Sequence, residues 1–313
     1  MKAFLLPHLI CPACLPAERP LALSNAREAD GDIVSGELVC RKCSRSFPIS
    51  DGVAMLAPDP HSHISGGQQR YNDDEMLNRY LWSHYGDLAG VGEVGESWQR
   101  WGAMIPPETG PACDAGCAVG RLTFEMAFRC QLAVGFDLSA GFVRAARRLA
   151  RERCGTFSLP LEGHLREKFS FSLPDAWRGD NLDFIVADAL AAPFAKGTFR
   201  LASSLNLLDR VSYPLAHLFD MNRLLAPAAA RFIIGDPFSW SNSPAPQERW
   251  LGGTAGGEYP GRGIDDVRDL LQGRNRVLTP PWRIEAEGSV SWPMRTHRNH
   301  REIITSEYLV AGR

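Results

Sequence analysis

The sequence lacks any long apolar run and any excess of charge of one sign. No stretch approaches the roughly 20 apolar residues that a membrane-spanning helix needs. The first ten residues hold a short apolar run, but Pro7 and His8 interrupt it, and no signal-peptide cleavage site follows. The formal net charge is −2 and the pI is near 6.5, so no global basic field points to a nucleic-acid partner. These absences predict a cytoplasmic protein without a membrane anchor.

The composition predicts one large domain and one small one. The chain has 313 residues, of which 44% are hydrophobic and 22% charged, values typical of a globular protein with a sizeable core. No internal repeat is visible. Because thiols stay reduced in the cytoplasm, we expect the eight cysteines to be metal ligands or buried small side chains before disulfides.

Four cysteines form two CxxC pairs near the N-terminus. Cys11 and Cys14 are separated from Cys40 and Cys43 by 25 residues, which include polar, turn-like residues such as 25–31. Two such pairs close a tetrahedral site with no open position, which is typical of structural zinc. Residues 36–56 predict a strand, a metal-binding turn and a second strand. A zinc ribbon is therefore expected over residues 1–57, where a small domain needs a metal for stability.

A linker and a helix are expected between the ribbon and the large domain. Residues 58–69 are rich in Pro, Gly, Ser and His, and the histidines at 61 and 63 are expected to be solvated rather than metal-bound. Apolar and aromatic residues recur at helical spacing over residues 68–88. The catalytic domain is expected over residues 70–313.

The rest of the chain alternates strand-like and helix-like segments, which is typical of an α/β fold with a mostly parallel, doubly wound sheet of seven strands. The expected strands cover residues 112–114, 132–136, 184–187, 200–205 and 231–235, with a final antiparallel pair near 282–288 and 303–311. The expected helices cover residues 121–129, 140–153, 214–225 and 264–272.

The first of these units has the pattern of a nucleotide-binding loop. A short apolar strand leads into Asp114, Gly116 and Gly120, and Asp137 ends the next strand, 23 residues after Asp114. The glycines permit a sharp turn and close approach of a ligand, and Asp137 is placed to accept hydrogen bonds from ribose hydroxyls. A dinucleotide-binding loop would have a third glycine. An acid at the start of the loop instead favours a cationic cofactor.

This stretch resembles the D-x-G-C-x-x-G motif of class I methyltransferases, which use S-adenosylmethionine. The resemblance implies a Rossmann-like fold and a set of cofactor-binding residues. Those residues are Asp114, Gly116, Cys117 and Gly120 at the methionine end, Asp137 and Leu138 at the ribose, and Asp188 and Ala189 at the adenine. The alternative is that the two glycines only shape a strand-to-helix turn.

Residues after the fourth strand are expected to face the methyl group, because ligands lie beyond the carboxyl ends of parallel strands. Asn206 is placed to contact cofactor or substrate, and Asp209 is placed to act in catalysis or to form an ion pair with Arg210. Tyr71 is a candidate lid over the cofactor. A neutral imidazole acceptor needs no base, whereas a hydroxyl or an ammonium needs one.

The chain from about residue 71 onward resembles the mercaptohistidine N-methyltransferase domain of ovothiol biosynthesis. The motifs that carry the resemblance are RYNDDEMLNRYLWSHYG, CDAGCAVGRLTFEMA, GFDLSAGFV, LPLEGHLREKFSFSLP, NLLDRVSYP and DPFSWSNSPAPQERWLGG. This resemblance implies a small-molecule substrate, with the methyl acceptor an imidazole or thiol of a histidine-derived thiol compound. The motif here begins Cys-Asp instead of Leu-Asp, and a zinc ribbon precedes it in place of a sulfoxide synthase module.

Several aromatic and cationic residues are candidates for the substrate pocket. Each has an ordinary structural alternative: His84 and Tyr85 as part of a buried helical stripe, the tryptophans as core, and the basic cluster as a solvated turn. The other candidates are Trp240, Trp250, Arg295, His297 and Arg298.

The ribbon favours a second function. It resembles ribbons fused to ribosomal-RNA guanine methyltransferases, and also small activator proteins that partner translation-factor and tRNA methyltransferases. An RNA or ribosome-associated enzyme predicts a basic face that joins the ribbon to the catalytic mouth, built from Arg19, Arg41, Lys42 and Arg45. A third reading is a scaffold that binds the cofactor without turnover. The oligomeric state stays open.

Overall fold

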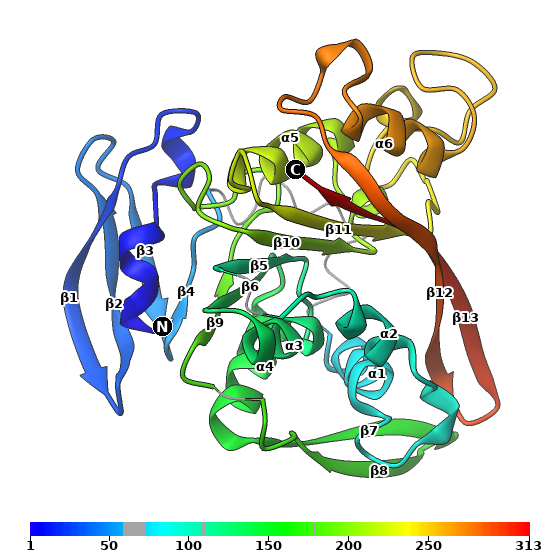
Figure 1. Ribbon diagram of the computed structural model, residues 1–313. Helices are drawn as coiled ribbons and strands as arrows, with labels where there is room; N and C mark the ends of the chain where they lie inside the picture. Colours follow the sequence, from blue (N-terminus) through cyan, green and yellow to red (C-terminus); the bar gives the residue numbers. More distant parts are fainter. Residues whose placement is uncertain (59–72, 108–109, 178) are drawn as a thin grey trace.

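The computed structural model describes residues 1–58, 73–107, 110–177 and 179–313 (Figure 1). The N-terminal ribbon begins with a 3-10 helix, η1 (Ala3–His8), followed by an antiparallel sheet in the order β1-β2-β3-β4. Its strands are β1 (Leu21–Ala29), β2 (Asp32–Cys40), β3 (Ser46–Ser50) and β4 (Val53–Ala54).

The turn expected over residues 25–31 is wrong for most of its length. Strand β1 continues to Ala29, which pairs with Asp32, so only Asp30 and Gly31 make the turn. A bulge in the pairing accommodates Asn25, whose φ is 51°. The hydrogen bonds that β2 supplies therefore outweigh the local preference of these polar residues for a turn.

The large domain is built on a seven-stranded sheet in the order β12-β13-β11-β10-β5-β6-β9. The five strands from β11 to β9 are parallel, and the final pair is antiparallel, which confirms the expected fold class. The strands are β5 (Ala112–Ala115), β6 (Ala133–Asp137), β9 (Leu182–Val186), β10 (Leu201–Leu205), β11 (Arg231–Asp236), β12 (Arg283–His297) and β13 (His300–Gly312).

Helices cover both faces of this sheet (Figure 1). Helices α5 and α6 lie on one face, and α1 to α4 lie on the other. The helices are α1 (Asp74–Tyr85), α2 (Ser97–Ala103), α3 (Arg121–Arg129), α4 (Ala140–Glu152), α5 (Pro214–Leu224) and α6 (Gly263–Leu271). Helices α3, α4, α5 and α6 begin and end within one residue of the sequence prediction, and α2 was not predicted.

Two hairpins differ from the sequence prediction. The insertion before the third strand of the sheet forms a separate hairpin of β7 (Cys154–Glu162) and β8 (Leu165–Ser172). The final antiparallel pair extends well beyond the sheet, so the segment around Arg295 is strand rather than a solvated turn. Strand β12 packs against β7 and α1, and the two hairpins and α1 therefore enclose the same end of the molecule.

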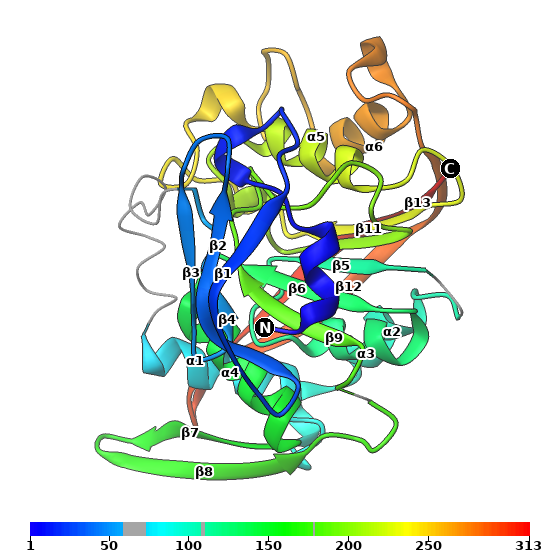
Figure 2. The same ribbon diagram turned by 90° about the vertical axis from the view of Figure 1, so that its left-hand side faces the viewer.

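The ribbon is joined to the edge of the large sheet. The backbone N–H of Leu56 donates to the carbonyl oxygen of Val186 at the end of β9, with an N···O distance of 2.7 Å. The N–H of Ile10 donates to Pro193 at 2.9 Å. Figure 2 looks onto the ribbon, which lies over β9. An unpaired edge strand is thereby covered.

Charged and apolar side chains reinforce this junction. The guanidinium of Arg147 on α4 pairs with Asp32 of the ribbon at 2.9 Å and with Asp183 of β9. Leu5 and Leu9 of the ribbon are buried in the same core as side chains of α5 and α6. The ribbon is therefore part of the hydrophobic core. No helix among the described residues is long and apolar enough to cross a membrane.

Candidate active site

A cavity of about 550 Å³ opens at the carboxyl ends of the parallel strands. It lies where the strand order reverses between β5 and β10, the usual place for a ligand in an open α/β sheet. Eight of the nine residues expected to bind the cofactor line it: Asp114, Gly116, Cys117, Asp137, Leu138, Asp188, Ala189 and Asn206.

Asp114 projects from β5 at the floor of this cavity and is 4% exposed. One carboxylate oxygen accepts from the hydroxyl of Ser203 at 2.5 Å, and the other accepts from Thr123 at 2.8 Å. Burial raises the pKa of Asp114 to about 6. The carboxylate is fixed in place and is anionic near neutral pH, which suits a cationic ligand group.

The loop after β5 depends on glycine at its two ends. Gly116 has φ 69° and Gly120 has φ 86°. A Cβ at Gly120 would lie 2.6 Å from the ring of Phe184 on β9, so a larger residue would separate α3 from the sheet. Gly120 does not line the cavity. The alternative reading, that a glycine shapes the turn, describes Gly120 better than it describes Gly116.

Asp137 ends β6 and is half-buried beside the loop. Its carboxylate accepts from the backbone N–H of Ala118 at 3.0 Å and of Ser139 at 2.8 Å. Burial raises its pKa, and these backbone hydrogen bonds act in the opposite direction. The side chain is held where β6 meets the cavity, and its orientation is set by the backbone rather than by a ligand.

The adenine segment predicted after β9 is supported by a residue that the sequence analysis missed. The Nδ1 of His217 on α5 lies 3.1 Å from the carbonyl oxygen of Ala189, and its Nε2 lies 2.8 Å from the hydroxyl of Ser204. The carboxylate of Asp188 accepts from the N–H of Leu190 at 2.9 Å. Burial lowers the pKa of His217, so its ring is neutral. A lone histidine at helical spacing gives no signal of this role.

Asn206 lies at the end of β10 and reaches the cavity. Its φ is 57°, and its N–H donates to Gly235 at 2.7 Å. Its side-chain oxygen accepts from the hydroxyl of Ser306, which in turn accepts from the indole N–H of Trp292 at 3.0 Å. This chain of hydrogen bonds connects β10 to β13 and β12, and it fixes the Asn206 amide at the wall of the cavity.

Asp209 lies behind the cavity wall and is not among its lining residues. It is 1% exposed, pairs with Arg210 at 3.1 Å and accepts from the N–H of Ser239 at 2.9 Å. Burial raises its pKa, as it does for its buried neighbour Asp236. In the structure Asp209 forms the ion pair with Arg210 that the sequence analysis gave as its alternative role. Tyr71, the third residue expected in catalysis, lies outside the described residues.

Aromatic side chains form part of the remaining wall, and the sequence analysis identified few of them. Tyr80 on α1 and Phe142 on α4 have ring centroids 4.7 Å apart, and Trp98 and Trp292 complete the wall. His84 also lines the cavity, with its ring centroid 4.1 Å from that of Trp98. In the sequence, only the position of His84 on the expected helix indicated a place in the pocket.

The other expected pocket residues lie elsewhere. The rings of Trp240 and Trp250 stack on each other, with centroids 6.1 Å apart, outside the cavity lining. The guanidinium of Arg295 is buried and pairs with Glu167 of β8 at 2.9 Å. His297 and Arg298 are exposed at the end of the hairpin. Arg295 is therefore not part of an open basic cluster, because it joins the two hairpins.

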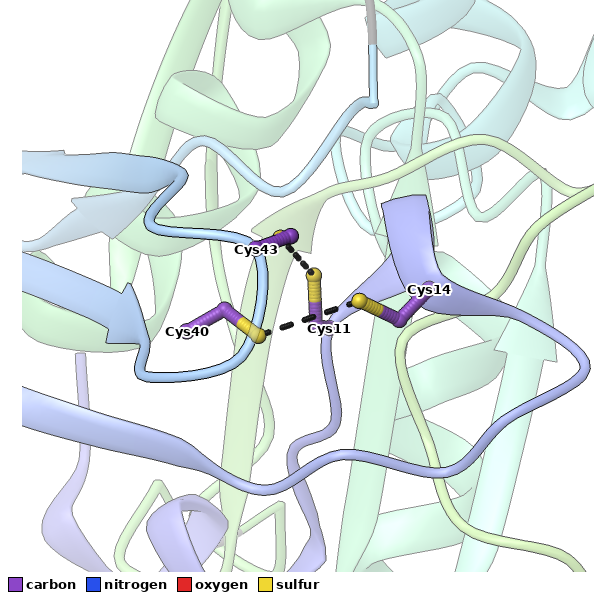
Figure 3. Close-up of side chains that lie close together, drawn as sticks. All are labelled: Cys11, Cys14, Cys40 and Cys43. Carbon is purple, nitrogen blue, oxygen red and sulfur yellow. Dashed lines mark hydrogen bonds between the residues drawn. The ribbon is translucent and has the colours of Figure 1, made fainter.

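The four ribbon cysteines converge on one point (Figure 3). Their sulfur atoms lie within 4.8 Å of one another, with 3.7 Å between Cys11 and Cys43 and 3.8 Å between Cys14 and Cys40. All four donors are thiols, and they come from two tight turns. This arrangement fits a tetrahedral zinc ion and leaves no position open for catalysis.

Two family models match the chain. Residues 113–233 match a methyltransferase domain, and residues 2–52 match a Trm112p-like protein. Residues 113–233 therefore form a methyltransferase domain, for which the expected cofactor is S-adenosylmethionine. The cavity fits that cofactor, because it offers a buried carboxylate in Asp114, a second carboxylate in Asp137 and a closely approachable backbone at Gly116.

The methyltransferase resembles several solved structures. A chain from the complex between the Haloferax volcanii Trm112 methyltransferase activator and a putative methyltransferase is 18% identical, with a TM-score of 0.35. The match covers 52% of this chain and 60% of that one. A Methanosarcina mazei methyltransferase is 16% identical, with a TM-score of 0.43, and the match covers 67% of this chain and 94% of that one. Magnesium protoporphyrin IX methyltransferase from Synechocystis is 18% identical, with a TM-score of 0.43, and the match covers 80% of this chain and 95% of that one. No curated protein matches the chain.

Proposed function

We propose that this enzyme methylates a small molecule, the imidazole or thiol of a histidine-derived thiol compound. The observation that carries the proposal is the aromatic wall beside Asn206, formed by Tyr80, Trp98, Phe142 and Trp292. A cavity of about 550 Å³ is in the size range of small-molecule sites. Flat rings on several sides favour a flat acceptor, such as an imidazole, over an extended polymer.

The proposed cofactor arrangement places the methionine end near Asp114 and the ribose near Asp137. The anionic Asp114 attracts the cationic end of the cofactor, and Asp137 accepts hydrogen bonds from the ribose hydroxyls. Asp188 and Ala189 contact the adenine. The bound cofactor supplies an activated methyl carbon, so the protein's main task is to align the acceptor and to exclude water.

Within this arrangement, Asn206 lies between the cofactor and the acceptor. Its amide is held by the chain of hydrogen bonds through Ser306 and Trp292. An amide fixed in this way can hydrogen-bond the acceptor without reorganising during the reaction. We propose that Asp209 acts indirectly, by holding the guanidinium of Arg210, which does line the cavity.

The second candidate function is methylation of RNA or of a ribosome-associated substrate. It is favoured by the match of residues 2–52 to a Trm112p-like protein. The basic residues that would contact RNA are exposed on the ribbon: Arg19, Arg41, Lys42 and Arg45. None of the eight cysteines forms a disulfide, which supports a reducing, cytoplasmic setting for either function.

One labelling experiment separates the two candidates. The zinc-loaded protein is incubated with methyl-labelled S-adenosylmethionine, mercaptohistidine compounds and total RNA, and the fractions are then separated. We expect label in the thiol-histidine fraction. Label confined to RNA would contradict the small-molecule proposal and would support the second candidate.

A further inference from the structure

One polar side chain in the aromatic wall has no assigned role. His84 lies at the end of α1, is 5% exposed and lines the cavity. Its Nδ1 has no hydrogen-bond partner among the described residues. Protein atoms cover this nitrogen, so a ligand in the cavity can reach only the other ring nitrogen, Nε2. A polar ring that lines a cavity and whose nitrogens have no protein hydrogen bond can pair with a ligand there.

His84 is held in position from its backbone. The guanidinium of Arg121, at the start of α3, donates to the carbonyl oxygen of His84 at 3.0 Å. The same guanidinium forms two hydrogen bonds with Asp87, at 2.9 and 3.0 Å. Trp98 of α2 packs on the imidazole ring. The end of α1 is therefore tied to the loop that begins α3, and the ring has a fixed place beside the cofactor cavity.

We propose that the His84 imidazole accepts a hydrogen bond from a ring N–H of the methyl acceptor and so turns the acceptor's other ring nitrogen toward the methyl group. This inference rests on the proposed function and adds a residue that selects an azole acceptor. An azole ring has one N–H donor and one nitrogen lone pair. Fixing the donor therefore fixes the direction of the nucleophile.

The reaction balances without a further reagent. The free ring nitrogen of the acceptor forms a bond to the methyl carbon while the bond between that carbon and sulfur breaks, and its electron pair stays on sulfur. The products are the thioether form of the cofactor and a methylated azolium. Positive charge develops on the acceptor, so its N–H bond to His84 strengthens in the transition state. The N–H proton leaves to water after the product is released.

The surroundings of His84 keep its ring neutral, as this role requires. Burial lowers its pKa well below the usual value, and the Arg121 cation on α3 acts in the same direction. The other titratable rings near it, Tyr80 and Tyr85, come from α1 itself. A protonated imidazole would be a donor at both nitrogens and could not accept the hydrogen bond.

Two substitutions of His84 test the role against simple packing. His84→Gln keeps a hydrogen-bond acceptor, whereas His84→Phe keeps a ring of similar size and removes the acceptor. We expect kcat/KM to fall on the order of 30-fold in His84→Phe and only a few-fold in His84→Gln. Calorimetric affinity for S-adenosylmethionine should stay unchanged in both. His164→Ala, in the exposed turn between β7 and β8, is the control and should retain full activity.

The relative activities of the two variants decide the outcome. If His84→Phe is as active as the wild type and His84→Gln is the poorer enzyme, the ring is only packing and the proposal is wrong. The same pair is assayed on whichever fraction takes the label. If RNA is labelled, the proposed small-molecule function fails, but a loss specific to His84→Phe would still support His84 as the hydrogen-bond acceptor.

A spectroscopic test needs no methyl acceptor. The full chain is labelled with ¹⁵N at the histidine rings, saturated with S-adenosylhomocysteine and titrated with imidazole. We expect a saturable shift of the His84 ring signal, assigned by its loss in His84→Gln, with no change at His217. Absence of a His84 shift at every imidazole concentration that leaves the protein folded would overturn the proposal.

Discussion

The ribbon and the catalytic domain reach a stable fold in different ways. The catalytic domain surrounds a parallel sheet with helices and buries large apolar side chains on both faces. The ribbon has a small four-stranded sheet, four converging thiols and a shared junction with β9. A small domain cannot bury enough apolar surface alone. The comparison indicates that the ribbon is stabilised by metal and by its neighbour, and that it stabilises the edge of the neighbour in return.

The largest expected effect comes from breaking the metal site. Replacing Cys40 and Cys43 by serine should lower the melting temperature of the whole chain by on the order of 10 °C, because the ribbon core is continuous with that of α5 and α6. Differential scanning calorimetry with metal analysis measures this, and one zinc per chain should be lost. Cys154→Ser, at an exposed thiol outside the site, is the control. Equal melting temperatures for all three proteins would show that the ribbon and the sheet fold independently.

The next effect concerns the catalytic domain alone. In Gly120→Ala, the new Cβ meets the Phe184 ring in a left-handed backbone conformation, so we expect a loss of about 3 kcal/mol of unfolding free energy. Gly163→Ala, also at positive φ but with no atom within 4 Å of the added Cβ, should lose only about 1 kcal/mol. Chemical denaturation compares the two. Equal losses would mean that packing against Phe184 does not constrain this loop.

Asp114 provides a pH-dependent effect. Its pKa is raised from 3.8 to about 6, so the folded state holds the proton more tightly than the unfolded state. The contribution of Asp114 to stability is therefore lost as pH rises from about 4 to 6. Asp114→Asn should stabilise the cofactor-free protein at pH 7 by up to about 3 kcal/mol.

The same substitution should weaken cofactor binding. Wild-type affinity for S-adenosylmethionine should fall as pH drops below about 6, where Asp114 becomes neutral. Calorimetry at several pH values measures this. An Asp114→Asn variant that binds the cofactor as tightly as the wild type at pH 7 would remove the proposed attraction between this carboxylate and the cationic cofactor.

The smallest effect in this series is at the ribose end. Asp137→Ala should weaken S-adenosylmethionine binding by about tenfold, the value of roughly one lost charge-assisted hydrogen bond. Asp51→Ala, in an exposed turn of the ribbon, should bind normally. If the affinity of Asp137→Ala is unchanged in calorimetry, Asp137 does not contact the ribose.

The sequence allowed prediction of features that depend on local pattern. The paired CxxC spacing, the glycine loop and the alternation of strands and helices each reside in a short segment, and the helices α3 to α6 were located within one residue. Features set by distant segments could not be predicted. The aromatic wall joins Tyr80, Trp98 and Trp292 from three elements, and Arg295 finds Glu167 across 128 positions.

The candidate site shows the same difference between residues placed by local pattern and residues placed by distant segments. Asn206 could be located because it follows a strand of recognisable pattern. His217 could not be, since its contact with Ala189 depends on how α5 packs on the sheet. Asp209 has a suitable residue type in a suitable stretch, yet its side chain lies behind the wall. Only tertiary structure decides which face of such a turn meets the cavity.

The most direct test of the account is the rate of methyl transfer to a mercaptohistidine compound, measured with labelled S-adenosylmethionine at low and high salt. If the acceptor is a small molecule bound in the aromatic cavity, we expect a labelled thiol-histidine product and a rate that changes little with salt. Label that appears only in RNA, at a rate that falls steeply with salt, would contradict it.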